Sequence, residues 1–121
     1  MNWTDVLIAL VILVAFLVYR RVGLISVKDA RNYLKNGALV IDVRTAGEFV
    51  AGHLPVAVNL PVSEIDTNLA RRVKDKNQVL LLHCQSGARS GVARKKLIAL
   101  GCPNAFNMGS YSRAERIVGG K

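Results

Sequence analysis

The pattern of apolar positions divides the chain of 121 residues into two regions. Residues 6–19 (VLIALVILVAFLVY) form an unbroken apolar run of 14 residues. After residue 25, apolar and polar positions alternate in short blocks, which is typical of buried strands and of helices with one apolar face. The pattern therefore predicts a hydrophobic segment, residues 1–25, followed by one small domain, residues 26–121, with no room for a second core.

Within the predicted domain, four short apolar blocks predict strands because of their length and their β-branched residues. These blocks are residues 38–43, 56–59, 78–83 and 105–108. Segments with one apolar stripe, most of them preceded by Ser or Thr, predict helices between the strands. The helices span residues 27–35, 46–51, 63–74, 90–100 and 110–118. Strands that alternate with helices predict an α/β layer fold with a mainly parallel sheet.

The N-terminal apolar run predicts one transmembrane helix over residues 3–19, which would be roughly 26 Å long. Trp3 and Tyr19 are placed at its ends as an aromatic belt would be, and Arg20 and Arg21 can snorkel to the interface. A buried helix and a signal peptide are the alternatives, but the run has no polar face and its positive charge follows the apolar stretch. The positive-inside rule then predicts a single-pass protein of an inner or plasma membrane, with the N-terminus outside and the domain cytoplasmic.

The charge balance narrows the choice of partners. The chain carries 17 Lys and Arg against 8 Asp and Glu, a formal net charge of +9, and nearly all of the excess lies after residue 25. Its basic clusters are not interleaved with aromatic residues and match no nucleic-acid motif, so no nucleic-acid partner is expected. Anionic lipid and anionic substrates fit the charge better. Two cysteines exclude a disulfide framework and a four-cysteine zinc site.

The segment with the clearest chemical signal is Cys84-Gln-Ser-Gly-Ala-Arg89, between a hydrophobic strand and an amphipathic helix. Ligands of open parallel sheets bind at the carboxyl ends of the strands, where this loop falls. Loop amides and the positive end of the following helix favour a thiolate and should lower the pKa of Cys84. Arg89 can hold an anion with two hydrogen bonds, and Ser90 can cap the helix.

Other candidate residues have weaker claims. Cys102 lacks basic or glycine-rich surroundings, so packing is favoured over a role as a resolving thiol. His83 precedes Cys84 on a strand, so its side chain should point to the opposite face and not act as a base. His53 is expected to hydrogen-bond to backbone, because no second metal ligand is spaced to join it.

Four ordered stretches resemble the rhodanese (sulfurtransferase) family. Cys84-Gln-Ser-Gly-Ala-Arg-Ser90 resembles its active-site loop, and residues 78–83 are similar to the strand before that loop. Ile41-Asp-Val-Arg44 with Glu48-Phe49 is similar to a first signature, and residues 52–61 (GHLPVAVNLP) to a second. The resemblance covers residues 24–109. It implies a single-domain rhodanese fold, an open parallel five-stranded sheet with helices on both faces.

The resemblance also implies an activity. Cys84 would accept sulfane sulfur from a small anionic donor such as thiosulfate or a persulfide, and pass it to a thiophilic acceptor such as cyanide, a thiol or a protein. The implied substrate-binding residues are Gln85, Ser86, Gly87, Ala88 and Arg89. The implied supporting residues are Asp42, Arg44, Glu48, His53 and Ser90, with Arg44 expected to pair with Glu48. No cofactor and no metal are implied.

Two alternatives remain. A cysteine phosphatase needs five residues between cysteine and arginine, whereas four separate Cys84 from Arg89, so phosphatase activity is disfavoured. The other alternative is a membrane-tethered, non-catalytic module of the same fold that docks a protein partner. Many rhodanese domains continue with a tryptophan-bearing helix after the last strand. Here residues 108–121 contain no tryptophan, which leaves the identity of the acceptor open.

Overall fold

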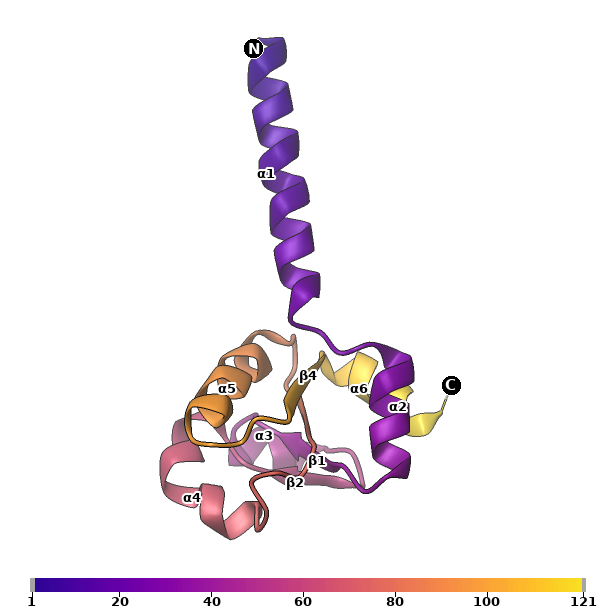
Figure 1. Ribbon diagram of the computed structural model, residues 1–121, viewed down its shortest axis with the longest axis vertical. Coiled ribbons are helices and arrows are strands. Elements are labelled where there is room, and N and C mark those ends of the chain that lie inside the picture. Colours follow the sequence, from indigo (N-terminus) through magenta and orange to yellow (C-terminus); the bar gives the residue numbers. More distant parts are fainter. Residues whose placement is uncertain (1, 121) are drawn as a thin grey trace.

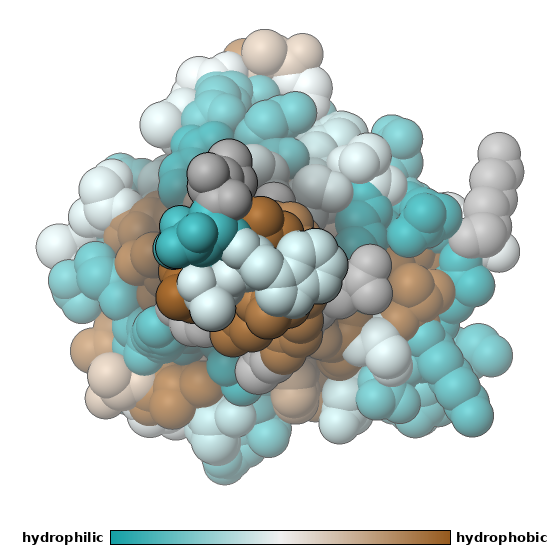
Figure 2. Space-filling view, turned by 90° about the horizontal axis from the view of Figure 1, so that it is seen from above, coloured by the Kyte–Doolittle hydropathy of each residue, from teal (hydrophilic) through white to brown (hydrophobic). Residues whose placement is uncertain are grey.

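The computed structural model describes residues 2–120, apart from the side chains of residues 19–22. Figure 1 shows a long helix, α1 (Trp3–Val22), standing away from a layered domain that contains the rest of the described chain. Figure 2 looks down on the molecule, and hydrophilic side chains cover much of the domain surface in this view. The described chain thus consists of α1 and this layered domain.

The predicted membrane anchor over residues 3–19 is wrong. Within the described part of the chain, no helix has both the length and the apolar character needed to cross a membrane. The described apolar side chains of α1 run from Val6 to Val18, roughly 20 Å of helix, against a hydrocarbon core of about 30 Å. The predicted single-pass topology and membrane location are overturned with the anchor. The interfacial roles expected of residues 19–21 concern side chains outside the described residues.

The domain is built on a parallel sheet in the order β2-β1-β3-β4. Its strands are β1 (Leu39–Asp42), β2 (Ala57–Asn59), β3 (Leu80–His83) and β4 (Ala105–Gly109). The described sheet thus has four strands and not the expected five. Leu24 makes only an isolated parallel bridge to Asn107, because Ser26 already caps the next helix and leaves no length for a ladder.

Helices cover both faces of the sheet, as predicted (Figure 1). They are α2 (Val27–Lys35), α3 (Ala46–Ala51), the 3-10 helix η1 (Val62–Glu64), α4 (Ile65–Arg72), α5 (Ala88–Ala99) and α6 (Tyr111–Gly119). On one face, Ile41 and Leu82 pack with Leu69 of α4 and Leu97 of α5. On the other face, strand residues that include Val40 and Leu81 pack with side chains of α2 and α6. Alternate strand side chains supply the two cores.

Local hydrogen bonds explain where the helices begin. The Ser26 hydroxyl accepts from the Asp29 amide at 3.1 Å and caps α2. Thr45 and Glu48 form a reciprocal capping box at the start of α3. The predicted cap at Ser90 is wrong, because α5 begins two residues earlier and its N-cap is Gly87, with φ of +98°. Ser90 is instead a buried residue inside the first turn of α5.

Strand register brings the first signature and the loop that contains Cys84 together. Asp42 at the end of β1 is paired with His83 at the end of β3. The Val43 amide donates to the His83 carbonyl at 3.0 Å, which extends this alignment past the strands. The loops that follow β1 and β3 therefore leave the carboxyl edge of the sheet side by side, where open α/β sheets bind ligands.

Candidate active site

The loop after β3 is supported from behind by the start of α6. The Tyr111 amide donates to the Gln85 carbonyl at 3.2 Å, and Ser86 forms an antiparallel bridge with Ser110. Gly87 packs so closely against Gly109 that a Cβ at Gly87 would lie 3.2 Å from the Gly109 Cα. This contact and the positive φ of Gly87 favour glycine at this position.

Cys84 is fully buried, and hydrogen-bond donors converge on its sulfur. The Gly87 amide donates to Sγ at 2.9 Å, and the Ser90 hydroxyl lies 3.6 Å from it. Burial by itself raises the pKa of the Cys84 thiol. Hydrogen bonds from the Ser90 hydroxyl and from the amides of Ser90, Gly87 and Ser86 outweigh burial and lower the pKa below its ordinary value. The surroundings therefore favour the thiolate, the reactive form of cysteine.

Asn107 on β4 connects the parts of this donor set. Its Oδ1 accepts from the Gly109 amide at 2.8 Å and lies 2.7 Å from the Ser90 hydroxyl, whose single proton is shared between Asn107 and the Cys84 sulfur. Its Nδ2 donates to the Gly87 carbonyl at 3.2 Å. Sequence reasoning missed Asn107. The available signal was a polar residue inside an otherwise apolar strand, where an unpaired amide would be costly.

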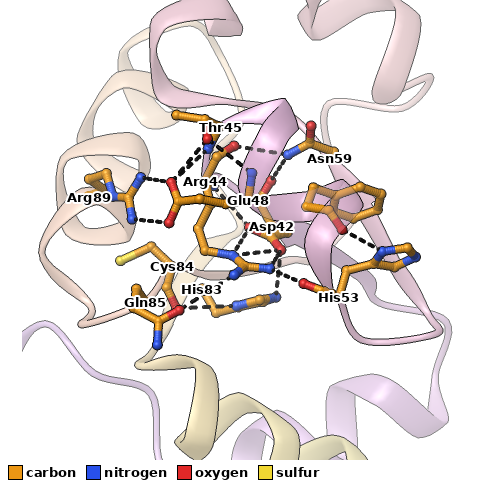
Figure 3. Close-up of polar contacts among 12 residues, drawn as sticks. Asp42, Arg44, Thr45, Glu48, His53, Asn59, His83, Cys84, Gln85 and Arg89 are labelled. Atoms are coloured by element: carbon orange, nitrogen blue, oxygen red, sulfur yellow. Dashed lines mark hydrogen bonds and ion pairs between the residues drawn. The ribbon is translucent and has the colours of Figure 1, made fainter.

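Arg89 binds Glu48 through two parallel hydrogen bonds (Figure 3). Arg89 Nη1 lies 2.6 Å from Glu48 Oε1, and Nη2 lies 3.0 Å from Oε2. The Thr45 amide and hydroxyl also donate to Oε1. The Arg89 guanidinium, with the donors of Thr45, lowers the pKa of Glu48 to about 2 against the cost of its desolvation. The expected Arg44–Glu48 pair is therefore wrong, because Glu48 is already bound by Arg89 and Thr45.

Arg44 instead pairs with Asp42, two residues earlier. Its Nε and Nη2 donate to the Asp42 carboxylate at 3.0 and 2.8 Å, and both side chains are buried. The pKa of Arg44 is raised, mainly by its hydrogen bond to Asp42. Arg44 Nη2 also donates to the Gly52 carbonyl at 2.7 Å, and Asn59 Nδ2 donates to the Arg44 carbonyl at 3.0 Å. The pair thus ties together the chain segments of both signatures.

A hollow of about 300 Å³ opens beside residues 84–89, the cysteine loop. It is lined by Arg44, Glu48, Ala51, Gly52, Gln85 and Tyr111. Arg44 lies over the Tyr111 ring, 4.8 Å from its centroid, and its Nη1 donates to Gln85 Oε1 at 3.4 Å. Tyr111 occupies a wall of the site although no tryptophan follows the last strand, and sequence reasoning did not single it out.

The two histidines lie as predicted. His83 is buried and its ring meets the edge of Tyr111 on the α6 side, whereas Cys84 belongs to the core under α5. Burial lowers the pKa of His83. His53 is exposed, hydrogen-bonds through Nδ1 to the Phe49 carbonyl at 2.8 Å and stacks on the Phe49 ring (Figure 3). In the part of the chain that the structure describes, no group of three His, Cys, Asp or Glu side chains is arranged to hold a metal.

The last members of the predicted loop have local contacts. The Ala88 amide donates to Ser86 Oγ at 3.4 Å, which tightens the turn into α5. Cys102 lies after the other end of α5, and its buried thiol has its pKa raised by burial. Gln85 and Arg89 of the loop contact Arg44 and Glu48, respectively. Arg44 in turn binds Asp42. His53 lies apart from these contacts, beside α3.

Comparisons with known proteins agree with this architecture. Thiosulfate sulfurtransferase PspE of Escherichia coli is 33% identical over 69 residues, which are 57% of this chain and 66% of that protein. Human thiosulfate:glutathione sulfurtransferase is 33% identical over 101 residues, 72% of this chain and 88% of that protein. The solved structure of a human single-domain sulfurtransferase superposes with a TM-score of 0.66 at 30% identity, covering 76% of this chain and 94% of that one.

The family match covers both signatures and the cysteine loop. Residues 26–114 match the rhodanese-like domain family, which includes Cys84 and every residue that lines the hollow. The relatives that are named as sulfurtransferases support a sulfurtransferase function. On its sequence and on its fold, the chain belongs to the rhodanese family.

Proposed function

We propose that the chain is an enzyme that carries sulfane sulfur as a persulfide on Cys84. The observation that carries this proposal is the convergence of the Gly87 amide and the Ser90 hydroxyl on the Cys84 sulfur at the start of α5. These donors stabilise a thiolate, and the same donors can stabilise the negative charge of a persulfide. The names of the relatives support sulfur transfer as the reaction class.

The proposed reaction has two balanced steps. The Cys84 thiolate attacks the terminal sulfur of a donor such as thiosulfate. A bond forms between Sγ and that sulfur, the sulfur–sulfur bond of the donor breaks, and sulfite leaves with the electron pair. A thiophilic acceptor, such as cyanide or a thiolate, then attacks the outer sulfur, and Cys84 leaves as a thiolate. The sulfur atom is transferred without any external oxidant or reductant.

The proposed roles of the surrounding residues follow their positions. Gln85, Ser86, Gly87, Ala88 and Arg89 form the loop that would surround the donor. Asp42, Arg44, Glu48, His53 and Ser90 would hold that loop and its neighbours in place. The Cys84 side chain that they surround is fully buried.

A thiosulfate:cyanide assay on the full chain tests the proposal. We expect thiocyanate formation and, in the absence of cyanide, an adduct with the mass of one sulfur atom that mass spectrometry localises to Cys84. Cys84→Ser should lose both, whereas Cys102→Ser should keep both. No adduct, or no rate above that of Cys84→Ser, would contradict the enzymatic function and favour a non-catalytic docking module.

A further inference from the structure

The cysteine loop is flanked by two arginines, and each is matched by a carboxylate. Arg44 is bound to Asp42 and Arg89 is bound to Glu48 (Figure 3). The four charges cancel as two neutral pairs. A thiolate on Cys84 adds a negative charge, so these groups together present no net positive charge to an incoming donor.

The Glu48–Arg89 pair is partly exposed and therefore accessible to a dissolved anion. The side chains are 35% and 41% exposed, whereas those of Asp42 and Arg44 are buried. Arg89 also lies close enough to Cys84 for the sulfur's charge to raise the pKa of the guanidinium, behind the larger effect of Glu48. A donor anion that approaches Sγ therefore competes with Glu48 for the two hydrogen-bond donors of the Arg89 guanidinium.

Glu48 is held firmly in the position in which it occupies the Arg89 guanidinium. Its Oε1 accepts from Thr45 Oγ1 at 3.1 Å and from the Thr45 amide at 3.2 Å, in addition to Arg89. With a pKa of about 2, the carboxylate remains ionised at any pH at which Cys84 is a thiolate. An oxyanion that displaced it would have to break the two hydrogen bonds to Arg89 and leave the Glu48 charge unpaired.

We propose that Glu48 is a specificity-determining residue that selects the donor by its charge. By neutralising Arg89, it disfavours dianionic donors such as thiosulfate and favours donors whose reacting end carries one negative charge, such as thiol persulfides. In that case a thiol leaves in place of sulfite: the Cys84 thiolate attacks the outer persulfide sulfur, the donor's sulfur–sulfur bond breaks, and the donor thiolate takes the electron pair. The selection of sulfur donors rests on the proposed function.

The decisive variant is Glu48→Gln, because glutamine keeps the shape and the capping-box contacts but removes the charge. Unpairing Arg89 should lower the KM for thiosulfate relative to that for methanethiosulfonate, which carries one negative charge fewer, by about fivefold. Asp75→Asn is the matched control. It removes one negative charge before β3, at the opposite edge of the sheet, where asparagine can still accept from the Asn77 amide. The KM ratio of this control should equal that of the wild type.

A second readout does not depend on sulfur transfer. Iodoacetate and iodoacetamide alkylate a thiolate by the same reaction but differ by one negative charge. The rate of alkylation of Cys84 by iodoacetate, divided by the rate with iodoacetamide, should rise about fivefold in Glu48→Gln and stay constant in Asp75→Asn. Mass spectrometry localises the label to Cys84. Because burial slows both reagents, the ratio isolates the effect of charge. Raising the salt concentration should reduce the difference between the variants.

The outcomes separate this inference from the proposed function. Unchanged ratios in folded Glu48→Gln would overturn charge selection, whether or not the wild type transfers sulfur. If the wild type has no transferase activity but the alkylation ratio still differs between it and Glu48→Gln, the proposed function is overturned and charge control at Cys84 stands. If Glu48→Gln does not fold, Glu48→Asp shortens the reach toward Arg89 and should shift the alkylation ratio in the same direction. No shift in that variant would count against the inference.

Discussion

Helix α5 has a buried free cysteine beside each of its ends, and the two thiols are opposite in character. Cys84 precedes the helix and its pKa is lowered, whereas Cys102 follows the helix and its pKa is raised. Burial acts on both in the same direction. The difference lies in the donors, because amides and a hydroxyl point at the Cys84 sulfur while burial is opposed at Cys102 only by the charge of Lys76.

The helix itself contributes to this contrast. The N-terminus of a helix carries a partial positive charge and unpaired amides, and its C-terminus carries a partial negative charge and unpaired carbonyls. A thiolate is therefore stabilised at the Cys84 end of α5 and destabilised at the Cys102 end. Burial alone does not make a cysteine reactive or inert; the groups that face the sulfur decide.

The largest expected effect comes from removing each thiol in turn. Cys84→Ser should reduce sulfur transfer to background, because the nucleophile is lost. Cys102→Ala should leave the KM and kcat unchanged and lower the free energy of unfolding by about 1 kcal/mol, the cost of a small buried cavity. Steady-state assays and urea unfolding measure the two quantities. A large loss of activity in folded Cys102→Ala would break the comparison.

Two glycines at the ends of α5 give a matched pair of backbone substitutions. Gly87 and Gly101 have φ angles of +98° and +96°, so alanine at either position costs about 1–2 kcal/mol of backbone strain. Gly87→Ala adds a close contact with the Gly109 backbone, whereas Gly101→Ala meets only the flexible Lys76 side chain. Urea unfolding should show the larger loss of stability in Gly87→Ala, and only this variant should also lose activity. Equal losses of stability would show that the close packing of Gly87 is dispensable.

The pH dependence of alkylation should distinguish the two thiols by sign. Cys84 should become reactive toward iodoacetamide at a lower pH than an ordinary thiol, and Cys102 at a higher pH. Ser90→Ala removes a donor to the thiolate, so it should raise the pKa of Cys84 and slow its alkylation at pH 7 by about threefold to tenfold. The Cys102 profile, followed by mass spectrometry in the same sample, serves as the internal control. An unshifted Cys84 profile would remove Ser90 from the donor set.

The smallest expected effect lies at Lys76, which donates to the Leu100 carbonyl at 3.0 Å. Lys76→Gln removes a positive charge near the C-terminus of α5 and should lower the free energy of unfolding by about 0.5 kcal/mol. It should also move the alkylation of Cys102 to higher pH and leave Cys84 unaffected. A shift at Cys84 would mean that the two ends of α5 are coupled.

Sequence patterns predicted the elements of this domain because local chemistry decides them. Ser26 and Thr45 cap α2 and α3 through contacts only three residues along the chain, and apolar blocks place the strands. The start of α5 was misjudged, because Gly87 and not Ser90 is its N-cap. The packing of Gly87 against Gly109 involves residues distant in sequence, and no local pattern reveals it.

The sequence by itself determined the α/β alternation, the family and the position of Cys84 between a buried strand and a helix, since each rests on local spacing. Tertiary structure decided the ion pairs, the number of strands and the walls of the site. Arg89 meets Glu48 because the register of β1 and β3 places their following loops side by side, and this contact leaves Arg44 to pair with Asp42, two residues earlier. Charge pairing depends on distance in space, and a sequence specifies only distance along the chain.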